Sequence, residues 1–341
     1  MPLSVPVTPD LLFDRLKHIK LGGATCLYTH EKCEELAPLV NQVLELKKEK
    51  EAVVLAHSYV NPELLLVADF VGDSYELSRK AQQTSAPTIV FAAVKFMAET
   101  AKILNPTKRV LVPGKMNGCS LADSITGEQV RALRKQYPDH TFVCYINTTA
   151  EVKAECDVCV TSSNVTRIIE AIPNQNIYFL PDKLMAKNVQ NELQKKNIYK
   201  NIAWWDGTCY VHEDYDPDMI RYLRTQFQDL KVVSHPECHE SVLAHSDYVG
   251  STSQMIDYVN KTSSNAFFLL TECGLSSRLQ LESPSKTFVG GCTMCRYMKS
   301  NTLQDLVRVL QVPDPEDDIS LSSDICQRAL KCIEEMFRYG K

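Results

Sequence analysis

The sequence predicts an α/β protein with parallel sheets, built from three similar units that can converge on a common axis. Apolar runs of four to six residues alternate with segments of helical period, which is the pattern of strand–helix–strand units. A set of polar residues also recurs three times along the 341-residue chain at nearly constant spacing. Internal repetition of this kind indicates repeated structural units.

The predicted elements cover most of the chain. A long helix over 32–49 begins the pattern, and another over 323–338 ends it. Apolar runs predict strands over 52–55, 88–93, 109–112, 141–145, 177–180, 231–233, 266–270 and 287–289. Helical periodicity predicts helices over 74–83, 127–136, 164–171 and 254–260.

The repeat is anchored at three strand ends, where His57, Tyr145 and His235 occupy equivalent places. Tyr145 lies 88 residues after His57, and His235 lies 90 residues after Tyr145. An aspartate follows each anchor after 12 residues: Asp69, Asp157 and Asp247. A hydroxyl residue follows each anchor after 17 residues: Ser74, Ser162 and Thr252. We expect these hydroxyls at helix starts, where free N–H groups favour carboxylates or phosphate; simple N-caps are the alternative.

The same register places three cysteines. Cys119, Cys209 and Cys295 lie 62, 64 and 60 residues beyond the three anchors, and each follows an apolar strand and a short turn. One thiolate from each unit would then meet the others at the common axis. The alternative is three unrelated core cysteines. Most of the 13 cysteines are expected in the core, as at Cys144, Cys326 and Cys332.

Three converging thiolates suit a soft or borderline metal. A structural zinc site is normally closed by four protein ligands, so three ligands indicate a centre with an open position. The residues alone leave two such centres: catalytic zinc in a lyase or hydrolase, and a 4Fe–4S cluster with one free iron. A non-enzymatic iron–sulfur redox sensor or electron carrier is a further alternative, although it would normally have a fourth ligand.

Polar residues at the strand ends can supply proton transfer and substrate contacts. His235 and Glu237 belong to a His-Pro-Glu segment, and a glutamate in a dry pocket can act as a general base. The other two strand ends carry residues that could orient substrate oxygens: His57, Tyr59, Tyr145 and Asn147. Three other histidines are weaker candidates for these roles: His140, His212 and His239.

Composition excludes several classes of function. The net charge of −5 argues against nucleic acid as the main partner. No apolar run reaches the roughly 18–20 residues of a membrane span, and the first residues do not form a secretory signal. We therefore expect a cytoplasmic protein, whose cysteines are reduced and available to a metal.

At these residues the chain resembles the quinolinate synthase family. The matching stretches include Ala-His-Ser-Tyr at 56–59 and His-Pro-Glu-Cys at 235–238. Others lie at 68–74, 96–102, 118–123, 145–148, 161–164, 250–254, 271–272 and 295–303. They run in the family's order from about residue 50 to 305, so the resemblance covers nearly the whole chain.

The resemblance implies three similar three-layer αβα domains with short parallel sheets, in a pseudo-threefold arrangement around a central iron–sulfur site. We place the first domain at 1–125 with the N-terminal helices, the second at 126–215, and the third at 216–341 with the C-terminal helices. The implied cofactor is one 4Fe–4S cluster with one open iron. Its implied ligands are Cys119, Cys209 and Cys295.

The implied activity is that of a transferase in de novo NAD biosynthesis. It condenses iminoaspartate with dihydroxyacetone phosphate to quinolinate and releases phosphate and water. Glu237 with His235 would move protons during imine formation and dehydration, and Tyr59 would assist isomerisation of the triose. The implied substrate-binding residues are His57, Ser74, Tyr145, Asn147, Ser162 and Thr252.

The expected partners are these two small molecules and, as the supplier of iminoaspartate, an aspartate oxidase. We expect a monomer or a homodimer without nucleic acid or membrane. The CxxC spacing of Cys292 and Cys295 also permits a disulfide between them once the cluster is lost.

Overall fold

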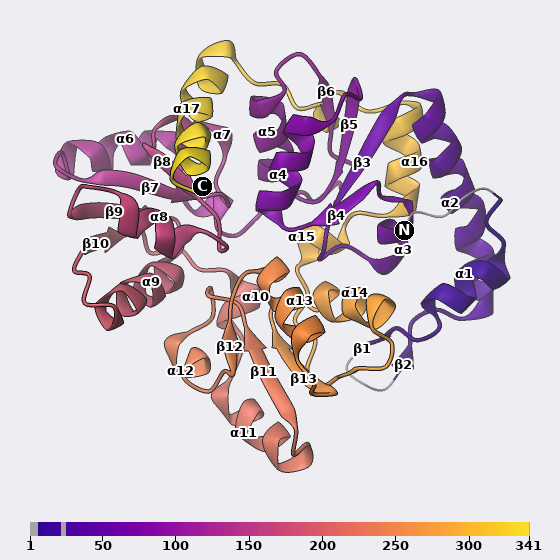
Figure 1. Ribbon diagram of the computed structural model, residues 1–341. Coiled ribbons are helices and arrows are strands. Elements are labelled where there is room, and N and C mark those ends of the chain that lie inside the picture. Colours follow the sequence, from indigo (N-terminus) through magenta and orange to yellow (C-terminus); the bar gives the residue numbers. More distant parts are fainter. Residues whose placement is uncertain (1–5, 22–24, 341) are drawn as a thin grey trace.

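Three four-stranded sheets dominate the computed structural model, which describes residues 6–21 and 25–340 (Figure 1). Every strand pair within these sheets is parallel. A short antiparallel pair, β1 (Lys20–Leu21) and β2 (Thr25–Cys26), precedes them. Helices flank the sheets, so the predicted fold class, three similar three-layer αβα units with short parallel sheets, is confirmed.

The three sheets share one strand order. The first has the order β4-β3-β5-β6, the second β8-β7-β9-β10 and the third β12-β11-β13-β14. The first sheet consists of β3 (Ala52–His57), β4 (Phe70–Gly72), β5 (Thr88–Ala92) and β6 (Arg109–Leu111). The second consists of β7 (Thr141–Tyr145), β8 (Val158–Val160), β9 (Asn176–Leu180) and β10 (Asn201–Trp204). The third consists of β11 (Leu230–Ser234), β12 (Tyr248–Val249), β13 (Ala266–Leu270) and β14 (Thr287–Phe288).

The helices lie between these strands and at both ends of the chain. α1 (Pro9–Leu16) and α2 (His30–Glu49) come first, followed by α3 (Pro62–Val67), α4 (Ser74–Gln83) and α5 (Lys95–Leu104). The middle of the chain forms α6 (Gly127–Gln136), α7 (Ala150–Ala154), α8 (Val165–Ala171), α9 (Lys183–Lys195) and α10 (Tyr210–Glu213). Next come α11 (Pro217–Gln226), α12 (Glu240–Leu243), α13 (Thr252–Lys261) and α14 (Gly274–Glu282). The last are α15 (Arg296–Lys299), α16 (Leu303–Gln311) and α17 (Ser323–Tyr339). No helix in the described part of the chain is long and apolar enough to cross a membrane.

The recurring aspartates show why the three units share a register. Asp69 accepts a hydrogen bond from the Val54 N–H at 2.7 Å and pairs with Lys47 of α2 at 2.8 Å. In the second unit Asp157 accepts the Phe142 N–H and pairs with Arg134 of α6. In the third unit Asp247 accepts the Val232 N–H and pairs with Arg224 of α11. Each aspartate therefore ties the first strand of its sheet to the helix that precedes that strand. A carboxylate bound by both a backbone amide and a cation makes a strong charge-assisted contact.

The carboxyl ends of β3, β7 and β11 face a common centre. Figure 1 shows the three units as sectors around this centre, with α15 beside it. Residues that follow these strand ends line one cavity there. In parallel α/β sheets, ligand sites lie at the carboxyl ends of strands. The strand ends of all three units therefore face one common site.

The C-terminal helices do not cover the third sheet. α16 packs against α2 and β5, and α17 packs against α7 and β8 (Figure 1). Cys332 of α17 is buried with its sulfur 3.5 Å from that of Cys144 in β7, as expected for core cysteines. Cys326, also expected in the core, is only partly buried. The two C-terminal helices therefore pack on the first and second units. The domain limits at 125 and 215 remain a prediction.

Candidate active site

All the residues proposed from the sequence for catalysis, substrate binding and metal binding line one cavity between the three units. They are His57, Tyr59, Ser74, Cys119, Tyr145, Asn147, Ser162, Cys209, His235, Glu237, Thr252 and Cys295. The repeat explains this convergence, because equivalent positions of three similar units meet around one axis.

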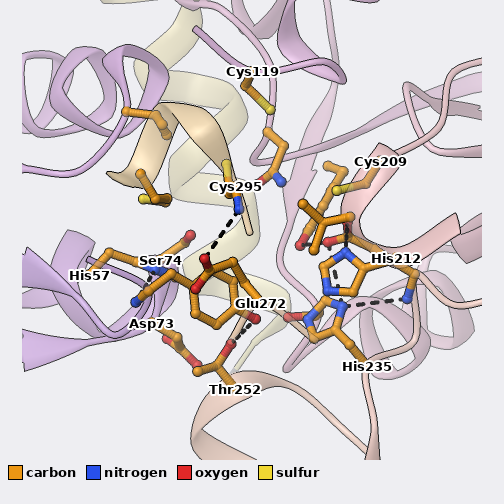
Figure 2. Close-up of a pocket in the computed structure, with 18 of the residues that line it drawn as sticks. His57, Asp73, Ser74, Cys119, Cys209, His212, His235, Thr252, Glu272 and Cys295 are labelled. Carbon is orange, nitrogen blue, oxygen red and sulfur yellow. Dashed lines mark hydrogen bonds and ion pairs between the residues drawn. The ribbon is translucent and has the colours of Figure 1, made fainter. Parts of the chain in front are cut away.

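The three cysteines lie on the same side of the cavity, each at the start of a helical turn (Figure 2). Cys209 is the N-cap of α10 and Cys295 is the N-cap of α15. Cys119 precedes a short turn of 3₁₀ helix, Ala122–Ser124. Each of the three is partly buried and unpaired with another cysteine.

The environment of these thiols fits a bound cationic centre. Burial raises the pKa of Cys119 to about 12, and the charge of Cys295 adds to this, although backbone amides of the following turn oppose it. Burial also raises the pKa of Cys209 and Cys295, and the charges of Glu237 and Cys119 add to the effect at Cys209. Negative charges that disfavour one another in a buried site are stabilised by a metal, which deprotonates coordinating thiols. The donor set of three sulfurs suits a soft metal or an iron–sulfur cluster.

Glu237 lies at the centre of a buried polar group. The Tyr145 hydroxyl donates to Glu237 Oε1 at 2.7 Å. His212 Nδ1 lies 3.0 Å from Oε2, and His235 Nδ1 lies 3.5 Å from Oε1. The rings of His212 and His235 stack with their centroids 4.6 Å apart. Glu237 is thus held by residues from both the second and the third sheet and from α10.

A line of short contacts connects this carboxylate to Tyr59. His212 Nε2 lies 2.9 Å from Thr271 Oγ1, on the opposite side of the ring from Glu237. Thr271 Oγ1 lies 2.6 Å from the Tyr59 hydroxyl, which in turn lies 2.9 Å from Thr252 Oγ1. Figure 2 shows the Thr252 end of this line below Glu272. Because hydroxyl and imidazole groups can both donate and accept, protons can be passed along it.

The burial of these groups sets their protonation. Burial would raise the pKa of Glu237, but His212, His235 and the Tyr145 hydroxyl outweigh burial and lower it to about 2. Burial lowers the pKa of His57 and His235 to about 3. It raises the pKa of Tyr145 far above the usual value of 10, and that of Tyr59 likewise. At neutral pH Glu237 is therefore ionised, the imidazoles of His57 and His235 are neutral, and the phenols of Tyr59 and Tyr145 are protonated.

Two of the three predicted helix-start hydroxyls stand where expected. Ser74 and Thr252 are the first residues of α4 and α13, while Asp73 and Ser251 before them are the N-caps. Neither hydroxyl is therefore used as an N-cap. Ser162 departs from the expectation, because it lies in a turn ahead of α8, whose N-cap is Asn164. It still lines the cavity.

Comparisons with known proteins give one consistent result. The family model of quinolinate synthetase A protein matches residues 41–338. A quinolinate synthase of Aquifex aeolicus is 43% identical over 310 residues, which cover 89% of this chain and 94% of the relative. The chain belongs to the quinolinate synthetase A protein family. A quinolinate synthase of Clostridium acetobutylicum is 42% identical over 305 residues, covering 89% of this chain and 99% of the relative. "Quinolinate synthase 2" of Mesorhizobium japonicum is 43% identical over 298 residues, covering 87% and 90%.

In this member of the quinolinate synthetase A protein family, some cavity residues were not singled out from the sequence. His212 was given a weak claim, yet it lines the cavity three residues after Cys209. Thr271 and Glu272 belong to a stretch that resembles the family, but no role was assigned to them. The signal was available, since both residues follow the carboxyl end of β13, as His235 follows that of β11.

The pairing of Cys292 with Cys295, which the spacing permits after loss of the cluster, is not present in this structure. Cys292 is joined to Cys273 instead. The Cys273 N–H donates to the Thr293 carbonyl at 3.2 Å, which brings the loop of Cys292 beside the start of α14. Glu272 accepts the Cys295 N–H at 3.1 Å, so Cys295 stays with the cavity.

Proposed function

We propose that this protein is a quinolinate synthase that condenses iminoaspartate with dihydroxyacetone phosphate to quinolinate, releasing phosphate and water. The observation that carries the proposal is the meeting of three cysteines with a buried carboxylate in one cavity between three units. The family of the chain and the names of its relatives support the same activity. Such a reaction would place the protein in NAD biosynthesis.

Cys119, Cys209 and Cys295 would hold a 4Fe–4S cluster with three cysteine ligands and one open iron. When bound, such a cluster supplies a Lewis-acidic iron that can polarise a substrate oxygen. The three thiols are contributed by three different units. Their convergence therefore requires the complete fold.

The anionic groups of the substrates would be bound at the opposite side of the cavity. Ser74 and Thr252 start ten-residue helices, whose free N–H groups favour carboxylates and phosphate. Ser162 would add a hydroxyl from the second unit, and His57 and Asn147 would orient substrate oxygens. Two carboxylates and one phosphate could then be held by residues of all three units.

Glu237 would be the base that removes protons from the substrates. It is ionised at neutral pH because His212, His235 and Tyr145 stabilise its charge despite burial. His235 is neutral and lies beside it, so it can accept a proton from the reacting groups. Tyr59 can donate to an oxygen of substrate and be reprotonated through Thr271, His212 and Glu237.

The chemistry of the substrate also bears on location and partners. Iminoaspartate hydrolyses readily, so an enzyme that oxidises aspartate must supply it nearby; an aspartate oxidase would fit. We propose a cytoplasmic enzyme that acts as a monomer or homodimer on these small molecules.

One observation favours a second candidate, a zinc-dependent lyase or hydrolase. The ligand atoms of Cys209, His212 and Glu237 lie within 4.8 Å of one another, and such a set can bind zinc. This site would use Cys209 and Glu237, so it is incompatible with the roles proposed above. It would also leave Cys119 and Cys295 without a function.

Metal analysis separates the two candidates. We would measure iron, sulfide and zinc, with a visible spectrum, in anaerobically purified wild type, Cys209→Ser and Cys326→Ser, and assay quinolinate formation. Cys326 lies on α17, away from the cavity, and serves as the matched control. About four irons in wild type and Cys326→Ser, lost in Cys209→Ser, with quinolinate formed, support the proposal. Zinc in place of iron, or iron without quinolinate, contradicts it.

A further inference from the structure

The side-chain amide of Asn188 reaches from α9 in the second unit to the third unit. Its Nδ2 donates to the carbonyl oxygens of Pro236 and Cys238, each at 2.8 Å. These two carbonyls flank Glu237 in the chain. A single amide group therefore holds the backbone on both sides of the buried carboxylate.

Equivalent positions in the other two units are held in a similar way. Asn147 and Tyr59 are the counterparts of Glu237, each two residues beyond its anchor. The buried Lys153 ammonium donates to both carbonyl oxygens that flank Asn147. The Lys299 ammonium donates to the carbonyl oxygen of Tyr59 at 2.6 Å. A nitrogen donor on the backbone of this position is thus common to all three units.

We propose that Asn188 is a positioning residue that fixes Glu237 relative to the substrates. The inference rests on the proposed function. Glu237 makes close side-chain contacts with Tyr145 of the second unit and with His212. A shift of its backbone would change these contacts together, because the carboxylate is buried and cannot replace them with water. Asn188 resists that shift and acts only through Glu237.

Asn191 offers a matched control on the same helix. It lies three residues after Asn188 and donates to Glu240 Oε2 at 3.1 Å in an exposed contact. Both asparagines connect α9 with the third unit, but Asn191 does not touch the backbone of the Glu237 loop. A general weakening of this connection should therefore affect both variants, whereas loss of positioning should affect Asn188 variants alone.

The test compares wild type, Asn188→Ala, Asn188→Asp and Asn191→Ala, all purified anaerobically with iron. Asn188→Asp keeps the size of the side chain and removes the donor. We expect kcat for quinolinate formation to fall about 10-fold to 100-fold in both Asn188 variants, as displaced catalytic groups do. KM should change less than about threefold, since the anion-binding hydroxyls are untouched. Asn191→Ala should stay within about twofold of wild type in kcat.

Three results overturn the inference. One is a wild-type kcat in Asn188→Asp with full iron content. Another is an equal loss of kcat in Asn191→Ala, and the third is loss of activity only in step with loss of iron. If wild type forms no quinolinate, the proposed function fails, and hydrogen exchange of the peptide around 235–238 tests positioning alone. Exchange there must speed up in Asn188→Ala and not in Asn191→Ala; unchanged exchange overturns the inference.

Discussion

The Thr271 hydroxyl lies 2.6 Å from the hydroxyl of Tyr59. The same oxygen lies 2.9 Å from His212 Nε2, and His212 Nδ1 lies 3.0 Å from Glu237. The Thr271 hydroxyl therefore connects, through His212, the Tyr59 phenol of the first unit with the Glu237 carboxylate of the third. Without its oxygen the two groups have no short connection of this kind.

Replacing Thr271 by valine should slow catalysis while the protein stays folded. Valine has nearly the same shape but lacks the oxygen that contacts Tyr59 and His212. We expect kcat to fall about 10-fold to 100-fold, within the range contributed by positioned proton transfer. Steady-state assays with iron analysis measure this. Thr262→Val is the control, since the Thr262 hydroxyl bonds only the Tyr258 carbonyl at the end of α13. Equal losses in the two variants would show that the link is not used.

Stability should decrease as the pH falls from about 6.5 towards 3. In the unfolded chain His57 and His235 take up protons near the ordinary pKa of 6.5, whereas burial in the folded chain lowers the pKa of both to about 3. The unfolded state then binds more protons across this window, so the free energy of unfolding falls with acid. Each histidine contributes a slope of up to about 1.4 kcal/mol per pH unit.

Urea unfolding in chelator at pH 7, 6 and 5 checks this slope. His57→Gln should flatten it, because its side chain does not titrate in either state. The exposed His245 is the control, and His245→Gln should leave the slope unchanged. An unaltered slope in His57→Gln means that His57 is protonated in the folded protein.

Removing one of the repeated aspartates should destabilise the fold without touching the cavity. Asp157 accepts the Phe142 N–H at 2.8 Å and forms a two-pronged ion pair with Arg134. Asp157→Ala leaves a backbone donor and a guanidinium without this partner. We expect a loss of about 1 to 3 kcal/mol in the free energy of unfolding, from chemical denaturation. Asp206→Ala removes an exposed ion pair with Lys183 and should cost less than about 0.5 kcal/mol. Similar losses in both variants would contradict the structural role of the repeat.

Glu272 should determine how firmly the proposed cluster is held. Its buried carboxylate accepts the N–H groups of Cys295 at 3.1 Å and Gly274 at 2.6 Å, and it pairs with Lys299 at 3.2 Å. Glu272→Gln weakens these charge-assisted contacts and loosens the turn that carries Cys295. We expect iron to be lost to a chelator about 10-fold faster, in line with changes to groups that orient metal ligands. Bleaching of the visible absorption gives the rate. Glu192→Gln, on the surface of α9, should match wild type; an unchanged rate in Glu272→Gln would contradict the expectation.

Much of the fold and site could be predicted because equivalent residues of the three units recur at nearly constant sequence spacing. The offsets from His57, Tyr145 and His235 lead to the aspartates and the cysteines, which the structure places equivalently. Periodicity also located α2 and α17 to within two residues of their observed limits. These features are local or repeated, so a single chain reveals them.

Other features depend on contacts between distant segments and left no such signal. An amphipathic helix such as α17 shows that one face is buried, but not that it packs on β8. His212 lies three residues after Cys209, but the same offset from Cys119 and Cys295 leads to Ala122 and Met298, so the repeat does not single out a histidine there. Ser162 has the right offset, but the turn at Asn164 delays the helix. Cys292 pairs with a residue outside its CxxC motif because the Thr293 carbonyl binds the Cys273 N–H.

The position of α17 has a consequence for biosynthesis. This helix buries Ala329, Cys332, Ile333 and Met336 and packs against β8 and α7 of the second unit. During translation the ribosome releases the second sheet long before it releases α17. The apolar face that α17 covers must therefore stay open to solvent or chaperones until α17 has emerged. Packing of the second unit is consequently completed only after α17 has emerged, and a metal centre that draws on all three units cannot be assembled before Cys295 has been synthesised.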